Sequence, residues 1–130
     1  MVADYAEIVG GKLYVMGGGW DTFGVAELPA QVRLAVAVGV RIGWDETNQP
    51  VVIRIVVEDD DGKELLRMEG NVNVGRPPEM QAGSTQLAQM AANVPIAVQQ
   101  GGGFRVVIRA GEGAAMVQRT LPFRVNVARR

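Results

Sequence analysis

Residues 32–42 decide the fold of this chain, and they read VRLAVAVGVRI. Branched or large apolar residues occupy every even position, whereas arginine, alanine or glycine occupies every odd one. A period of two is typical of a β-strand that buries one face in a core. We therefore predict that Val36 and Val38 are buried together, and that Ala35 and Ala37 face the opposite side.

The next two segments along the chain form a predicted hairpin. Residues 51–58 are apolar on both faces, which favours a strand in the middle of a sheet. Asp61-Gly62 follows, and this pair supplies the positive φ angles that a tight turn requires. We predict that Asp61 and Gly62 form the two-residue centre of the turn, so that residues 63–74 pair antiparallel with residues 51–58.

Residues 86–98 fit both a helical face and a strand alternation. A helix would have to end before Pro95 and would leave Ile96 and Val98 unused, so a strand near a sheet edge is favoured. Other strands are predicted at residues 4–9, 12–16, 104–109 and 116–127.

The 130 residues predict one domain, 1–130, with an all-β fold. We expect a single-domain antiparallel β-sandwich of about eight strands with immunoglobulin-like or jelly-roll-like connections. The polar connection at residues 76–84 is long enough to cross from one sheet to the other. The pattern leaves the order of the strands open.

Composition removes most catalytic chemistry. The chain has no Cys and no His, and its only serine is Ser84, so a nucleophile with an imidazole base is excluded. A formal net charge of −1 provides no field for nucleic acid or for an anionic membrane. We therefore expect neither an enzyme nor a nucleic-acid-binding protein.

No secretory leader is recognisable at the start of the chain. The longest uncharged apolar run, residues 34–40, is far shorter than the ~20 residues of a membrane-spanning helix. We expect a cytoplasmic protein without a membrane partner.

Two further patterns invite a metal or phosphate interpretation, and both are better explained as turns. Residues 58–61 are all acidic, but consecutive side chains point in different directions and no calcium-loop spacing is present. Glycines at 10–11 and 101–103 precede strands, whereas a phosphate loop precedes a helix. We expect no metal and no cofactor.

The candidate binding residues surround the two tryptophans. Gly17, Gly18, Gly19, Trp20 and Asp21 combine a flexible backbone with a large flat side chain, which suits a sugar, peptide or protein partner. The structural interpretation of the same residues is a β-bulge followed by a tryptophan that closes one end of the sandwich, and this interpretation is favoured. The second candidate, Trp44, follows the strongest strand and has the same two interpretations.

Several short motifs together resemble a known family. They are Ala3-Asp4-Tyr5-Ala6, Gly17-Gly18-Gly19-Trp20, Asn93-Val94-Pro95, Gly102-Gly103-Phe104-Arg105 and Leu121-Pro122-Phe123-Arg124-Val125. The chain resembles, over nearly its whole length, a family of short bacterial proteins classified as a domain of unknown function. The resemblance implies a small β-sandwich and assigns no site residues.

The function expected from these observations is a non-enzymatic binding or assembly module that acts through protein–protein contacts, with a protein partner or with itself. A mean hydropathy of +0.10 suggests that another chain covers part of the apolar strand surface. One such surface is the small-residue face of residues 35–39. The alternative is a small-ligand or carbohydrate-binding β-sandwich that uses Trp20 or Trp44.

Overall fold

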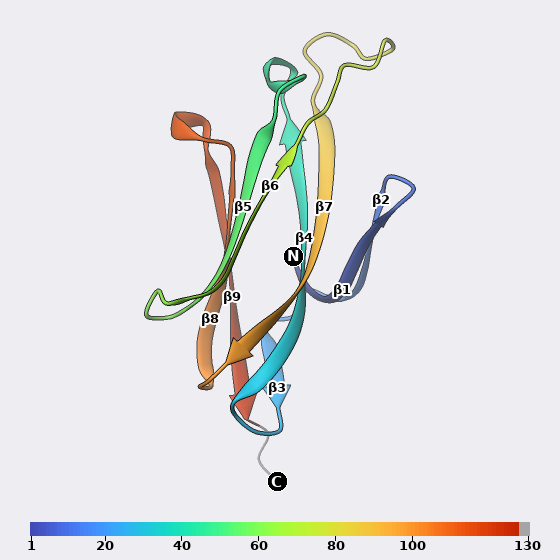
Figure 1. Ribbon diagram of the computed structural model, residues 1–130. Helices are drawn as coiled ribbons and strands as arrows, with labels where there is room; N and C mark the ends of the chain where they lie inside the picture. Colours follow the sequence, from blue (N-terminus) through green and yellow to red (C-terminus); the bar gives the residue numbers. More distant parts are fainter. Residues whose placement is uncertain (128–130) are drawn as a thin grey trace.

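A computed structural model describes residues 1–127, which form two facing β-sheets (Figure 1). Within these residues the strands are β1 (Val2–Val9), β2 (Lys12–Gly18), β3 (Thr22–Val25), β4 (Ala30–Ile42), β5 (Val51–Asp59), β6 (Glu64–Val72), β7 (Gln86–Val98), β8 (Gly102–Ala110) and β9 (Val117–Val127). Two short 3-10 turns, η1 (Trp44–Glu46) and η2 (Gly113–Ala115), follow β4 and β8. The predicted all-β sandwich is confirmed.

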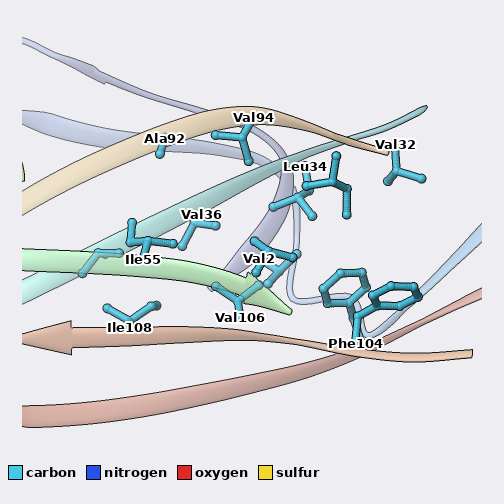
Figure 2. Packing of buried hydrophobic residues seen from close by; sticks show 14 of the residues in the cluster. Val2, Val32, Leu34, Val36, Ile55, Ala92, Val94, Phe104, Val106 and Ile108 are labelled. Atoms are coloured by element: carbon cyan, nitrogen blue, oxygen red, sulfur yellow. The ribbon is translucent and has the colours of Figure 1, made fainter. Parts of the chain in front are cut away.

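The alternation in β4 builds the core. Val32, Leu34 and Val36 are almost completely buried, and their side chains point across the interior toward the opposite sheet (Figure 2). Ile55 on β5 and Val106 on β8 meet them from that sheet. A single cluster of buried residues therefore lies between the two sheets.

The ambiguous segment 86–98 is the strand β7, as predicted. Val94, Ile96 and Val98 are buried in the core, and Pro95 between them is exposed. β7 pairs with β4 along its whole length and stands at the end of its sheet. An edge position tolerates Pro95, because the missing N–H is not needed on the open side.

The strand order is β2-β1-β4-β7 in the first sheet and β3-β9-β8-β5-β6 in the second. β5 has a neighbour on each side, which confirms that it is central. The long connection between β6 and β7 passes from the second sheet to the first, as its length predicted. One strand pair departs from the antiparallel arrangement, because the short strand β3, which was not predicted, pairs parallel with β9. The short sequence of β3 contains Gly24 and carries no clear alternation.

The turn between β5 and β6 corrects the predicted two-residue hairpin. The N–H of Gly62 donates to the carbonyl of Asp59 at 3.0 Å, and the N–H of Asp59 donates to the carbonyl of Lys63 at 3.0 Å. Asp60 and Asp61 are thus the centre of the turn, and Gly62 follows at a φ of 82° as the third loop residue. Three-residue hairpin loops place glycine at this left-handed position. The hairpin and the positive φ of Gly62 were predicted correctly, but the centre was placed one residue late.

Candidate functional site

The hairpin formed by β1 and β2 lies partly outside the sandwich. β1 pairs with β4 only at Val2 opposite Val36 and Ala3 opposite Ala35, after which the hairpin leaves the sheet on the side of β7 (Figure 1). Its inner face packs on a second apolar cluster, formed by Ala3, Ala6, Ala35 and Ala37 with Leu13, Val15 and Ala91. Small side chains allow the two layers to approach closely. The chain's own hairpin therefore covers Ala35 and Ala37, while Gly39 stays exposed.

A side-chain clamp holds the hairpin to β7. The amide of Asn93 donates from Nδ2 to the carbonyl of Ala6 at 2.7 Å, and Oδ1 of Asn93 accepts from the N–H of Ala6 at 3.2 Å. Both backbone groups of Ala6 point away from β2 and would otherwise lack a strand partner. The carboxamide takes the place of a neighbouring strand at this one residue, because it offers one donor and one acceptor as a peptide group does.

We expect Asn93→Ala to loosen the hairpin without unfolding the sandwich. The substitution removes both hydrogen bonds to Ala6, and such bonds contribute about 0.5–1.5 kcal/mol each. Hydrogen exchange should then be at least about tenfold faster at the Ala6 amide, with little change at Val94 in the core. Asn93→Asp is the matched control: it keeps the acceptor for the N–H but sets a carboxylate against the Ala6 carbonyl, so it should also loosen the hairpin. Unchanged exchange at Ala6 in both variants would contradict the clamp.

The opposite face of the hairpin carries exposed aromatic and apolar side chains. We call the six residues on this side the hairpin outer face: Tyr5, Glu7, Val9, Lys12, Tyr14 and Met16. They form three cross-strand pairs, namely Tyr5 with Met16, Glu7 with Tyr14, and Val9 with Lys12. Tyr5, Tyr14 and Met16 are 44%, 51% and 66% exposed. Both tyrosines of the chain thus lie on this one surface.

One hydrogen bond orders this surface. The phenol of Tyr5 donates to Oε2 of Glu7 at 3.1 Å. This bond to a carboxylate raises the pKa of Tyr5 above its ordinary value. Tyr5 lies opposite Met16, so its ring and the side chain of Met16 form an apolar end to the face.

The exposed apolar side chains concentrate on the hairpin. Among the described residues, the large hydrophobic side chains that are exposed are Met1, Tyr5, Ile8, Val9, Tyr14, Met16, Leu87, Met116, Val117 and Val127. Half of these belong to β1 or β2. The outer face of the second sheet is different, since Arg54 there pairs with Glu69 at 3.3 Å and with Glu112 at 2.9 Å. That charged face is typical of a solvated surface, whereas the hairpin has the composition of a contact surface.

The structure places Trp20 at one end of the core. Its ring lies 5.6 Å from the ring of Phe23 and 6.1 Å, edge to face, from the ring of Phe123. The indole N–H is buried and has no acceptor among residues 1–127. Asp21 beside it is exposed, and its carbonyl accepts from the N–H of Arg124 at 2.7 Å.

The glycines before Trp20 are not a bulge. The pairing of β1 with β2 keeps one register from Val9 opposite Lys12 to Ala3 opposite Gly18, so no residue is inserted. Gly17 has a φ of 61°, and a Cβ at this position would meet the side chain of Asp4. The backbone conformation therefore favours glycine there. β2 ends at Gly18, and the N–H of the next residue, Gly19, donates to the carbonyl of Val2 at 2.9 Å.

Trp44 begins η1, directly after β4, and Figure 1 shows that β4 ends far from β3, the strand that follows Trp20. The guanidinium of Arg76 lies 3.9 Å from the centre of the Trp44 ring, and Nη2 of Arg76 donates to the Trp44 carbonyl at 2.6 Å. This cation–π contact ties the long β6–β7 connection to the end of β4. The candidate residues around Trp20 and Trp44 are therefore not brought together.

Of the four acidic residues 58–61, Asp59, Asp60 and Asp61 border an open cleft of about 420 Å³ between the β5–β6 turn and the β7–β8 turn. Within the described chain no three acidic side chains converge as metal ligands would. Oδ1 of Asp59 instead accepts from the N–H groups of Asp61 and Lys63, both at 2.9 Å. Glu58 on β5 forms an ion pair with Arg105, the residue opposite it on β8. Asp59 and Glu58 thus serve the turn and the sheet.

The hairpin outer face was not identified from the sequence, although a signal for it was present. Gly10 and Gly11 predict a two-residue turn, and this turn fixes Val9 opposite Lys12. Counting back from that pair places Tyr14 opposite Glu7 and Met16 opposite Tyr5. The register alone therefore puts both tyrosines on one face.

Comparison with known proteins identifies the family. The family of unknown function DUF6941 matches residues 1–126, so the chain belongs to this family. No curated protein matches the chain. In the part of the chain that the structure describes, no helix is long and apolar enough to cross a membrane.

Proposed function

We propose that this protein is a non-enzymatic, cytoplasmic binding module that acts through protein–protein contacts, with the hairpin outer face as its contact surface. The observation that carries the proposal is the gathering of Tyr5, Tyr14 and Met16, all exposed, on one face of the β1–β2 hairpin. Tyrosine and methionine are enriched at protein interfaces, and tyrosine is common among the residues that contribute most binding energy. The absence of Cys and His supports a non-enzymatic role, and the near-zero net charge favours a protein over a nucleic-acid or membrane partner.

We also propose that the sandwich is immunoglobulin-like. In chain order β1, β4, β5, β6, β7, β8 and β9 take the positions of strands A, B, C, C′, E, F and G. The sheet neighbours agree with this assignment, since β1-β4-β7 corresponds to A-B-E and β9-β8-β5-β6 to G-F-C-C′. Residues 73–85 replace strand D, and the β1–β2 hairpin extends strand A. The contact surface is thus an addition to the sandwich rather than one of its end loops.

The small-ligand alternative has less support. Trp20 packs against Phe23 and Phe123, and the guanidinium of Arg76 lies over Trp44. A sugar-binding platform presents a free aromatic face to its ligand. These contacts favour structural roles for both tryptophans.

The proposal is tested with a photo-crosslinking phenylalanine analogue at position 14, with the same analogue at Thr120 as control. Thr120 is exposed on the outer face of the second sheet. In cells producing the protein, irradiation should give a discrete protein adduct from position 14 and none from position 120. An excess of the parent protein without the photo-crosslinking residue should lower the yield of the adduct, whereas an excess of Tyr14→Lys protein should not. The absence of any adduct at position 14, or equal adducts at both positions, would overturn the proposal.

A further inference from the structure

We infer that the partner of this surface is a second copy of the chain, and that β2 of each copy pairs antiparallel with β2 of the other about a two-fold axis at Tyr14. This inference rests on the proposed function and names its partner. It joins two four-stranded sheets into one sheet of eight strands, with the order β7-β4-β1-β2-β2-β1-β4-β7.

The first support is a row of backbone groups on β2 that lack a strand partner. Ala6 lies opposite Val15, and the N–H and carbonyl of Ala6 bond to Asn93 on the side away from β2. Directly opposed residues of an antiparallel pair either both bond to each other or both point outward. Val15 therefore points its own N–H and carbonyl outward from the hairpin, and so does Leu13, two residues earlier. β2 stands at the end of its sheet, and among residues 1–127 no strand covers this edge.

The second support is that β2 lacks the features that protect the other edges. Charged side chains, proline and short length discourage pairing at a sheet edge. The β7 edge carries Pro95, the β6 edge carries Glu64, Arg67 and Glu69, and β3 is only four residues long. By contrast, β2 is regularly paired with β1 from Lys12 to Met16 and carries only one charge, at Lys12.

The third support is the fit of β2 to itself. With Tyr14 on the axis, Tyr14 meets Tyr14, Leu13 meets Val15, and Lys12 meets Met16 of the other copy. No like charges are opposed across the new edge, and all residues in the ladder precede Gly17, where the φ of 61° ends the regular extended geometry. On the joined outer face, one Lys12 and one Glu7 from each copy balance in charge. Pairing of this kind is isologous, as two-fold dimers require.

Area explains why edge pairing is needed. The hairpin outer face spans five residues on each of two strands, a footprint of about 17 by 10 Å at the usual strand spacings. That is well below the ~800 Å² per partner of a standard stable interface. Face-to-face contact of two hairpins would therefore be weak. Edge pairing adds main-chain hydrogen bonds and makes one continuous face with four tyrosines.

Cysteine cross-linking tests the inference in the full chain, which contains no native Cys. In the proposed register Tyr14 and its symmetry mate form a non-hydrogen-bonded pair, with Cα atoms about 4.5 Å apart. This separation permits a disulfide. Tyr14→Cys should therefore form a disulfide-linked dimer in a glutathione redox buffer. The matched control is Tyr5→Cys, because Tyr5 has similar exposure on the same face but lies on β1, away from the axis.

We expect Tyr14→Cys to cross-link at least about tenfold faster than Tyr5→Cys, and Val15→Pro to suppress the Tyr14→Cys dimer by removing an outward N–H. Circular dichroism verifies that the double variant is folded, and Val15→Ala, which keeps the N–H, should leave cross-linking in place. Equal rates for the two cysteine variants would overturn pairing with a second copy. If photo-crosslinking at position 14 then yields an adduct with a different protein, the proposed function stands and only the self-pairing fails.

Discussion

Val36→Asp is expected to abolish folding. Val36 lies in the centre of β4, is completely buried, and faces the core between the two sheets. An aspartate there would have no cationic partner among the apolar core residues. The free-energy cost of burying its charge, or of protonating it, therefore adds to the cost of the lost packing. We expect a loss of at least about 4 kcal/mol, a large part of the ~5–15 kcal/mol that stabilises a typical domain. Far-UV circular dichroism and urea denaturation measure this effect.

Ala37→Lys is the informative comparison, because Ala37 is buried on the other face of the same strand, beneath the hairpin. Lysine there should displace the β1–β2 hairpin at a loss of about 1–3 kcal/mol and leave the sandwich folded. If Val36→Asp instead keeps the parental urea midpoint, the register of β4, and with it the fold, is wrong. If Ala37→Lys unfolds the chain as completely as Val36→Asp, the hairpin is an integral part of the sandwich rather than a docked addition.

Phe123→Ala should produce the second largest loss of stability. The side chain of Phe123 is almost completely buried; it stacks on Phe104 at a ring separation of 5.5 Å and forms a T-shaped contact with Trp20. Truncating a buried phenylalanine removes its transfer free energy and leaves a cavity, with a loss of about 3–5 kcal/mol. Differential scanning calorimetry should show a large fall in Tm, accompanied by a change in Trp20 fluorescence.

Phe23→Ala is the matched control for this cluster. Phe23 touches Trp20 but is only partly buried, so the same truncation should lower the stability by about 1–2 kcal/mol. Equal losses for the two variants would show that the aromatic cluster is not centred on Phe123.

The strands that follow a clear alternation could be predicted from the sequence. β4 and β7 each point every second residue toward the core between the two sheets, and with a two-residue period only one strand register places all of these side chains inside. The hairpin turns were recognisable from glycines that adopt positive φ, including Gly10, Gly11 and Gly62. These are local signals, and each is complete within a few residues of chain.

The remaining features depend on long-range contacts that a local pattern does not contain. β3 is defined by parallel pairing with β9, about a hundred residues later, and its own four residues carry little signal. The hairpin leaves its sheet because Asn93 supplies a carboxamide to Ala6 and because Ala35 and Ala37 leave room for it. The contact of Trp20 with Phe123 was not predictable from the sequence, because it depends on where β9, about a hundred residues later, enters the core.

The central claim is that the β1–β2 hairpin is the contact surface and that it pairs with its own copy. The most direct test is sedimentation equilibrium of the parent protein and of Tyr14→Lys under identical conditions at micromolar concentration. The parent should sediment at twice the 13.9 kDa mass of one chain, and Tyr14→Lys should sediment at the mass of one chain with unchanged circular dichroism. A parent protein that remains monomeric at these concentrations, or a Tyr14→Lys variant that dimerises as the parent does, would contradict the claim.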